Sequence, residues 1–324
     1  MVVAVEASGL CRSDWHAWAG HDEGVTLPHV PGHELAGTVV SVGRAVRRWT
    51  AGARVTVPFV CGCGACDCCR SGDAQVCPHQ EQPGFTHWGS FAERVALRYA
   101  DANLVALPDG LSAAAAASLG CRFATSYRAL SARARVQPGE WVAVLGCGGV
   151  GLSAVMVAHA LGARVVAVDV RIEALSLASR LGADVVLDST GIDLPAAVGE
   201  ATDGGAHVAV DALGSPATCA DAVLSLRRRG RHVQVGLVPA ALGHPTVPMD
   251  RVIAYELDLL GSHGMAAADY PGLLDLVVAG RLRPDRLVTS TIGLADAAVA
   301  LTRMDQVPAT GITVVDPRRS VRES

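Results

Sequence analysis

The sequence lacks the features that would place it in a membrane or on a nucleic acid. None of its apolar runs reaches the roughly 18 residues that span a bilayer. The opening residues 1–6 lack the basic stretch and the cleavage site of a secretory signal. Basic residues are not in excess, since 27 Lys and Arg stand against 31 Asp and Glu, which gives a formal net charge of -4. We therefore expect a cytoplasmic protein with a small-molecule partner and no affinity for nucleic acid or membranes.

Aromatic residues are also scarce, at 4%, whereas glycine is abundant at 35 residues and half of the chain is hydrophobic. This mixture suits an α/β protein with tight turns and close contacts between helices and strands. At 324 residues the chain exceeds what one hydrophobic core usually supports. We therefore expect more than one domain.

The pattern of the chain changes near Pro138. Before residue 118, short apolar runs such as 37–43 and 54–58 are typical of the strands of a β-rich domain. Beyond Pro138, strand and helix patterns alternate, which indicates a parallel, doubly wound sheet. The expected strands are 141–145, 164–168, 185–187, 207–210, 232–235 and 257–260, and the expected helices are 150–161, 173–181 and 216–226. After Gly261 we expect a helix at 270–279, a Thr-rich segment at 288–292 and a frayed polar tail at 317–324.

A glycine-rich loop, G-x-G-x-x-G, stands between the strand at 141–145 and the following helix. Glycines there permit a tight turn and a close approach of a pyrophosphate to the start of the helix. Asp169, at the end of the next strand, can accept both ribose hydroxyls and would repel a 2′-phosphate, so NAD is favoured over NADP. Arg171 nearby weakens that preference. The expected cofactor-binding residues are Gly146, Gly148, Gly149, Val150, Gly151 and Asp169.

Six of the ten cysteines lie between Cys61 and Cys77. In a reducing compartment such a cluster favours metal binding over disulfides. Four thiolates at short spacing can enclose a tetrahedral zinc ion, and a site without an open position is structural. The alternative interpretation is a cluster of free thiols, and Cys61 and Cys68 remain alternative ligands. We select the four ligands Cys63, Cys66, Cys69 and Cys77.

Three further candidate ligands stand far apart in the sequence. Cys11 lies in the segment 9–16, His33 in Pro-Gly-His-Glu at 31–34, and Cys121 in the segment 119–125. Two thiolates and one imidazole would leave one position of a zinc ion open, which is typical of catalytic sites. Each segment alone is a weak signal, because a single Cys or His is more often part of a core.

Together with the four cysteines and the glycine loop, these segments resemble the zinc-containing alcohol dehydrogenases of the medium-chain dehydrogenase/reductase family, over nearly the whole chain. In that family the cysteine of C-x-[ST]-D, the histidine of G-H-E and the cysteine of G-C-x-F-x-T bind the catalytic zinc. Cys11, His33 and Cys121 occupy those places here. The resemblance implies two zinc ions per chain and NAD. It also implies a GroES-like catalytic domain at 1–122, a Rossmann domain at 123–261, and a return to the catalytic domain at 262–324.

The resemblance also implies roles for the residues around the metal. Asp14 matches the carboxylate that orients the ligand histidine, and Glu34 the acidic residue beside the metal. A zinc-activated alcohol must lose a proton before it gives hydride to NAD. Ser13 can take that proton by hydrogen bond, and the imidazole of His16 can deliver it to solvent. The remaining matches are Arg12 near the pyrophosphate, Thr125 beside the nicotinamide and Phe59 in the alcohol cleft.

Two alternatives to a zinc-dependent alcohol dehydrogenase stay open. Family members have roughly thirty residues before the segment matching 2–7, so either the chain start is internal to a longer gene or a hairpin has been lost. Missing strands would leave a sheet edge exposed and the small domain weakened. A catalytically silent protein that binds NAD or zinc is therefore one alternative. A polyol dehydrogenase is another, although those enzymes typically have a glutamate where Cys121 stands. Zinc-free reductases lack both cysteine sets and are disfavoured.

Family members form dimers or tetramers, so the resemblance implies a homodimer or homotetramer. The region 257–260 is the expected contact. The expected substrate is a primary or secondary alcohol and its aldehyde or ketone.

Overall fold

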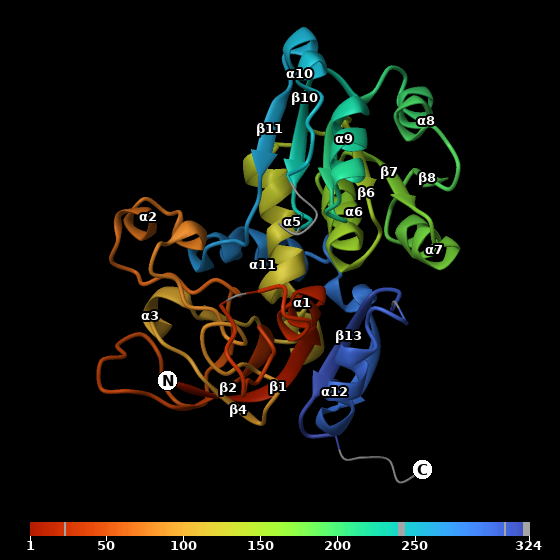
Figure 1. The fold of residues 1–324 in the computed structure, drawn as a ribbon. Coiled ribbons are helices and arrows are strands. Elements are labelled where there is room, and N and C mark those ends of the chain that lie inside the picture. Colours follow the sequence, from red (N-terminus) through yellow and green to blue (C-terminus); the bar gives the residue numbers. More distant parts are fainter. Residues whose placement is uncertain (23, 239–243, 308, 320–324) are drawn as a thin grey trace. The chain divides into compact units, whose positions relative to one another are not determined.

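The computed structural model describes residues 1–22, 24–238, 244–307 and 309–319, and Figure 1 shows its ribbon. The chain forms two compact units, Met1–Ala124 with Gly264–Ser324, and Thr125–His263. Both contain helices and strands, so the expected α/β class is confirmed. None of the helices in the described ranges is long and apolar enough to cross a membrane. Of the polar tail expected at 317–324, residues 320–324 lie outside the described residues.

The first unit is built on a mixed sheet. In the described part of the chain its strands follow the order β12-β13-β1-β2-β3-β5, and β4 pairs with β1. Neighbouring strands are antiparallel except for β12 and β13. The strands are β1 (Val2–Leu10), β2 (Glu34–Ser41), β3 (Arg54–Thr56), β4 (Arg94–Ala96), β5 (Val105–Ala106), β12 (Val288–Gly293) and β13 (Ile312–Asp316).

Short helices complete this unit. The α-helices are α1 (Arg12–Trp18), α2 (Asp67–Arg70), α3 (Ala100–Asn103), α4 (Ala113–Ala117), α11 (Tyr270–Val278) and α12 (Leu294–Thr302). The 3-10 turns are η1 (Ala74–Val76), η5 (Ala267–Asp269) and η6 (Pro284–Leu287), and the π-helical turn is η2 (Leu119–Phe123).

Strand β1 is an interior strand of the sheet. Its side chains alternate, so that Val3 and Val5 enter a buried cluster with Leu35 and Val39 of β2. On its other side β1 pairs with β4 at its start and with β13 at its end. Figure 1 shows β13, in blue, beside β1, in red, so strands from the beginning and the end of the sequence are neighbours in one sheet.

The pairing of β1 with β2 positions the first two candidate ligands. Gly9 pairs with Glu34, and the two strands run in opposite directions. The end of β1 and the beginning of β2 therefore lie side by side. Cys11, directly after β1, is thereby brought next to His33, directly before β2.

The segment that carries Cys121 reaches the same end of the sheet through α4. This helix begins at Ser112, whose hydroxyl accepts a hydrogen bond from the N–H of Ala115 at 3.2 Å. It consists of alanines, which let it pack closely on β1 and β2. In the turn η2, a Cβ on Gly120 would lie 3.2 Å from Cα of Glu34. The small side chains thus place Cys121 close to the start of β2.

The second unit is an open parallel sheet in the order β11-β10-β9-β6-β7-β8. The chain begins in the middle at β6, adds β7 and β8 on one side, and then adds β9, β10 and β11 on the other. This is the order of a doubly wound sheet, in which ligands bind at the carboxyl ends of the strands where the winding reverses. That place is beside the carboxyl end of β6. The strands are β6 (Trp141–Leu145), β7 (Arg164–Asp169), β8 (Val185–Asp188), β9 (Ala206–Asp211), β10 (Leu226–Gln234) and β11 (Asp258–Gly261).

Helices cover both faces of this sheet. They are α5 (Ala124–Arg128), α6 (Gly149–Ala160), α7 (Ile172–Arg180), α8 (Leu194–Ala201), α9 (Pro216–Leu224), α10 (Met249–Tyr255) and the π-helical turn η3 (Ala129–Arg133). Ala143 and Leu145 of β6 pack in one buried cluster with α8 and α9. Since side chains alternate along a strand, Val144 points to the opposite face, toward α6.

The expected elements of this unit are present, and the largest difference is at β10. The strand expected at 232–235 begins at Leu226, because the ladder to β9 has a register shift between Leu226 and Arg231. Arg229, with φ of +62°, lies within that irregular stretch. Consecutive arginines have no alternating apolar pattern, so the early start of the strand is not visible in the sequence. Helix α9 correspondingly ends at Leu224 rather than 226.

Gly151→Ala should destabilise the second unit, because a Cβ there would overlap the carbonyl oxygen of Gly146. Forcing a methyl group into a packed contact costs about 1–3 kcal/mol, so we expect a lower midpoint of thermal unfolding. Gly148→Ala is the matched control, since no atom lies within 4 Å of its Cβ position and its φ is -78°. Equal midpoints for the two variants would contradict this account of the packing.

Candidate metal and cofactor sites

Asp14 connects the first two candidate ligands. Its buried carboxylate accepts hydrogen bonds from the backbone N–H of Cys11 and of Gly32, both at 3.0 Å. It also pairs with Nδ1 of His33 at 2.9 Å. A carboxylate can only accept, so Nδ1 carries a hydrogen. Burial alone would lower the pKa of His33, but the charge and hydrogen bond of Asp14, together with Cys11, raise it well above its usual value. When the ring is neutral, its lone pair is therefore on Nε2. That Nε2 is buried and has no hydrogen-bond partner among the described residues.

The structure brings the three candidate catalytic ligands together. The ligand atoms of Cys11, His33 and Cys121, with one carboxylate oxygen of Glu34, lie within 4.8 Å of one another. Cys11 and His33 are buried, and Cys121 is partly exposed. The side chains therefore converge on one small volume at the end of the sheet in the first unit.

The pKa values of the two thiols are shifted in opposite directions. A hydrogen bond between them, together with burial, raises the pKa of Cys121 well above its usual value, whereas the same hydrogen bond lowers that of Cys11. A divalent cation between the sulfurs would favour the thiolate form of both, because metal binding displaces thiol protons. Two sulfurs and an imidazole nitrogen are ligands that zinc prefers, and the lone pair of His33 is otherwise unused. The residues present fit a zinc ion.

Glu34 is held by Arg122, a residue that the sequence motifs did not single out. Nε of Arg122 donates to Oε1 of Glu34 at 3.0 Å, Nη2 pairs with Oε2, and the backbone N–H of Arg122 also donates to Oε1 at 3.0 Å. The side chain of Glu34 is fully buried and that of Arg122 is 8% exposed. Burial raises the pKa of Glu34, and the guanidinium charge opposes this rise.

The second candidate metal site is the cysteine lobe around α2, which is made of Cys63, Cys66, Cys69 and Cys77. Their four sulfur atoms lie within 4.8 Å of one another. Backbone N–H groups of Ala65 and Cys66 lower the pKa of Cys63 to about 6, as expected where a loop stabilises a thiolate. The four residues have the number and type of ligands that a closed structural zinc site requires.

The two other cysteines of this region are separate from the lobe. Cys61 is buried, its thiol donates to the carbonyl of Pro58 at 3.6 Å, and burial raises its pKa to about 12. Cys68 and Cys69 are neighbours on the short helix α2 rather than on a loop. Since adjacent residues of a helix point about 100° apart, only Cys69 faces the other three sulfurs.

The predicted proton exit begins beside the candidate metal ligands. Oγ of Ser13 lies 3.8 Å from the sulfur of Cys11. His16 is three residues further along α1, and its Nδ1 is 2.9 Å from Nδ1 of His21. From the sequence, His21 had no ligand-like context and no visible connection with His16.

A helix cap explains the contact between the two histidines. Gly20 follows α1 with φ of +79°, the N–H of His21 donates to the carbonyl of His16 at 2.9 Å, and that of Gly20 to the carbonyl of Ala17 at 3.2 Å. These are the two hydrogen bonds of a Schellman motif. The motif turns the chain back so that His21 lies over His16, and Gly20 was the sequence signal for it.

Arg12 and Phe59 also belong to the first unit. The guanidinium of Arg12 lies 4.4 Å from the ring centre of Trp15 and pairs with Asp305 at 3.3 Å, half exposed. The ring of Phe59 lies 6.0 Å from that of His33, edge to face. Phe85, which the sequence motifs did not select, lies closer to that ring, at 5.3 Å.

The glycine loop and Asp169 belong to the second unit. Helix α6 begins after Gly148 without a side-chain cap, which leaves its first N–H groups available to an anion. Asp169 accepts the N–H of Cys147 at 2.7 Å and that of Arg171 at 2.9 Å, and it lies 3.4 Å from Nε of Arg171. The carboxylate therefore organises the loop and is partly neutralised. Thr125 is buried in this unit, and its carbonyl accepts the hydroxyl of Ser262 at 3.4 Å.

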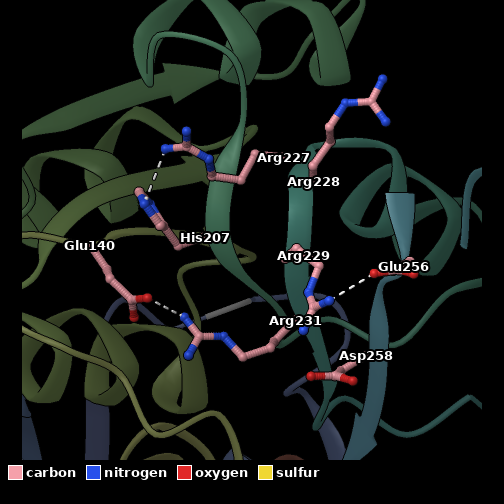
Figure 2. A pocket seen from close by; sticks show the side chains of 8 residues that line it. All are labelled: Glu140, His207, Arg227, Arg228, Arg229, Arg231, Glu256 and Asp258. Carbon is pink, nitrogen blue, oxygen red and sulfur yellow. Dashed lines mark hydrogen bonds and ion pairs between the residues drawn. The ribbon is translucent and has the colours of Figure 1, made fainter. Parts of the chain in front are cut away.

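A separate charged pocket of about 400 Å³ lies at the amino ends of β6, β9, β10 and β11 (Figure 2). It is lined by Glu140, His207, Arg227, Arg228, Arg229, Arg231, Glu256 and Asp258. Figure 2 shows that the guanidinium groups diverge. Arg231 pairs with Glu140 at 2.5 Å, and Arg229 with Glu256 at 2.7 Å. The pocket is at the opposite end of β6 from the glycine loop, so it is not the dinucleotide site.

Comparison with known proteins agrees with this geometry. Residues 1–109 match the model of the alcohol dehydrogenase GroES-like domain, and residues 149–279 that of the zinc-binding dehydrogenases. An alcohol dehydrogenase of Geobacillus stearothermophilus is 36% identical over 87% of this chain and 82% of its own length. An NAD-dependent alcohol dehydrogenase of Sulfurisphaera tokodaii is 33% identical, over 98% of this chain and 92% of its own. The solved alcohol dehydrogenase TADH from Thermus sp. ATN1 superposes with a TM-score of 0.88 at 30% identity, covering 97% of this chain and 91% of that one.

The chain is thus an oxidoreductase whose homologues are zinc- and NAD-dependent alcohol dehydrogenases. It belongs to the zinc-binding alcohol dehydrogenases of the medium-chain dehydrogenase/reductase family. The family resemblance predicted from the motifs is confirmed, as is the combination of a GroES-like sheet with a Rossmann-like sheet.

Cys69→Ser and Cys68→Ser form a matched pair of neighbours. Only the first removes a sulfur from the lobe, so we expect Cys69→Ser to lose one equivalent of zinc and to unfold at lower temperature. Cys68→Ser should keep the metal content and the unfolding midpoint of the unchanged protein. Elemental analysis after exhaustive dialysis measures the zinc, and loss of zinc from Cys68→Ser instead would show that the ligand set is wrong.

Proposed function

We propose that the protein is a zinc-dependent dehydrogenase that transfers hydride between a primary or secondary alcohol and NAD. The product is the corresponding aldehyde or ketone. The observation that carries the proposal is the convergence of Cys11, His33 and Cys121, with the buried Nε2 of His33 left without a protein partner among the described residues. Two thiolates and one imidazole leave an open position, as in catalytic zinc sites.

We assign Cys11, His33 and Cys121 as ligands of the catalytic zinc, which when bound would lower the pKa of an alcohol hydroxyl. Asp14 is the positioning residue, because its hydrogen bond to Nδ1 of His33 keeps Nε2 available to the metal. We assign Cys63, Cys66, Cys69 and Cys77 as ligands of a second, structural zinc.

The proposed proton exit begins at the neighbours of Cys11. We assign Ser13, whose Oγ lies 3.8 Å from the sulfur of Cys11, as the hydroxyl that takes the alcohol proton while it releases its own. We assign His16, three residues further along α1, as the base that takes up the released proton. Between Nδ1 of His16 and Nδ1 of His21, one nitrogen donates and the other accepts, so a proton that reaches His16 can continue to His21. His21 is exposed and can release the proton to water.

The cofactor proposal rests on the second unit. The N–H groups at the start of α6 suit the pyrophosphate, for which Gly146, Gly148, Gly149, Val150 and Gly151 form the loop. Asp169 supports NAD over NADP, since its carboxylate can accept ribose hydroxyls and disfavours a 2′-phosphate. From the family match we assign Arg12 to the pyrophosphate, Thr125 to the nicotinamide and Phe59 to the alcohol cleft.

Domain roles and assembly complete the proposal. We assign 1–122 and 262–324 to catalysis and 123–261 to NAD binding. We further propose a homodimer or homotetramer that associates through the edge strand β11, where Leu259 is 41% exposed. An unpaired edge strand is a ready surface for pairing with a second copy.

The pH dependence should report the pair of histidines. Burial, followed by the charge of His21, lowers the pKa of His16 below its usual value. In His21→Ala both effects weaken, so the pKa of His16 rises and its basic form is lost at a higher pH. We expect the acidic limb of the kcat/KM profile for alcohol oxidation to move to higher pH. His244→Ala, at an exposed position in the second unit, is the control, and an unmoved limb in His21→Ala would rule out this role.

Turnover tests the proposed function directly. We expect NAD-dependent oxidation of at least one of ethanol, benzyl alcohol and cinnamyl alcohol, with slower turnover when NADP replaces NAD. Ser13→Ala should lower kcat by roughly 100-fold, which is the scale of a proton-transfer contribution. Ser176→Ala, on the exposed side of α7, should leave kcat unchanged. A protein that binds two zinc ions and NAD but oxidises none of these alcohols would support the catalytically silent alternative.

A further inference from the structure

The residue that follows one candidate catalytic ligand contacts the neighbours of the other two. Nη1 of Arg122 donates to the carbonyl of Leu10 at 3.1 Å, and Leu10 precedes Cys11. The same guanidinium pairs with Glu34, which follows His33. Arg122 itself follows Cys121 in the sequence. The guanidinium therefore joins the three ligand-bearing segments without contributing a ligand.

The carboxylate of Glu34 has two possible partners, a metal at the three-ligand site and the guanidinium of Arg122. One of its carboxylate oxygens lies within 4.8 Å of the sulfurs of Cys11 and Cys121 and of the His33 nitrogen, within the reach of a metal at that point. Carboxylate oxygen is a common zinc ligand, and a fourth protein ligand would close the site. Both oxygens are instead engaged by Arg122. The ion pair thus competes with the metal for the same carboxylate.

Stability alone is a poor explanation for this ion pair. Two buried charges lose their hydration, and that loss often equals or exceeds their mutual attraction. The fold nevertheless reserves space for them at Gly9, where an added Cβ would overlap Oε2 of Glu34 and lie 2.9 Å from Nη2 of Arg122. Gly9 is not among the residues with positive φ, so its backbone does not require glycine. The space is needed for the ion pair.

We propose that Arg122 is a positioning residue that holds Glu34 away from the metal and so keeps the fourth coordination position open to the substrate. This rests on the proposed function of Cys11, His33 and Cys121 as a catalytic zinc site. Without the guanidinium, the buried carboxylate of Glu34 keeps the hydrogen bond from the backbone N–H of residue 122 but loses its counter-charge, beside a divalent cation. It then binds the cation and changes an open site into a closed one.

The test replaces zinc by Co2+, whose visible absorption reports the number of its ligands, and uses imidazole as the probe for the open position. The cysteine lobe is closed, so the spectral change on adding imidazole comes from the three-ligand site alone. The unchanged protein should bind imidazole with a clear spectral shift. Arg122→Met should have an altered spectrum before imidazole is added and should bind imidazole at least about tenfold more weakly.

Three further variants make the outcome specific. Arg122→Met combined with Glu34→Gln should recover the imidazole affinity of the unchanged protein, because the competing anion is removed. Arg122→Lys keeps the charge but not the two-point contact, so it should lose less affinity than Arg122→Met. Arg94→Met, at an exposed arginine of β4 in the same unit, should behave like the unchanged protein.

The proposal is overturned if Arg122→Met binds imidazole as tightly as the unchanged protein, or if the double variant stays as weak as Arg122→Met. Should Arg122→Met fail to fold, Arg122→Lys decides, and full imidazole affinity in that variant overturns the proposal. None of these measurements uses turnover. A protein that shows the expected imidazole series but oxidises no alcohol would retain this inference while the proposed function fails.

Discussion

The hydrogen bond between Asp14 and His33 is the contact on which the arrangement of the centre depends. Through the same carboxylate, Asp14 also holds the backbone of Cys11 and Gly32, so one buried side chain ties two loops together. The register of β1 and β2 brings those loops within its reach. Because Nδ1 is engaged, Nε2 is the ring nitrogen that is left for a metal. Asp14 thus both fixes the position of the two loops and determines which nitrogen of His33 is available to a metal.

The second buried carboxylate of the centre, that of Glu34, has the opposite relation to a cation. Asp14 makes a histidine nitrogen available to a cation, whereas Arg122 makes the carboxylate of Glu34 unavailable to it. A small volume that contains two thiols, an imidazole and a carboxylate would suit a closed four-ligand site. In our proposal the guanidinium prevents that closure, whereas the four-cysteine lobe in the same unit has no such group among its ligands.

Much of this organisation could be predicted from the sequence. The spacing of the cysteines, the glycine loop and the three short motifs all name residues within one segment, where local pattern is informative. The pairing of Arg122 with Glu34 could not be predicted, because the two residues are 88 positions apart and neither motif indicates that their side chains meet.

Other differences have similar physical reasons. The contact of His16 with His21 depends on a helix cap that spacing alone does not indicate. Cys68 and Cys69 could be separated only once α2 fixed their directions. The early start of β10 was hidden by consecutive arginines, since strands are recognised by alternating apolar residues.

The most direct test of the central claim is an anomalous difference map from crystals of the zinc-loaded protein, recorded at the zinc absorption edge. The account predicts two peaks per chain. One lies among the sulfurs of the cysteine lobe, and the other is bound by Cys11, His33 and Cys121, with Glu34 paired to Arg122. A single peak confined to the cysteine lobe would contradict it.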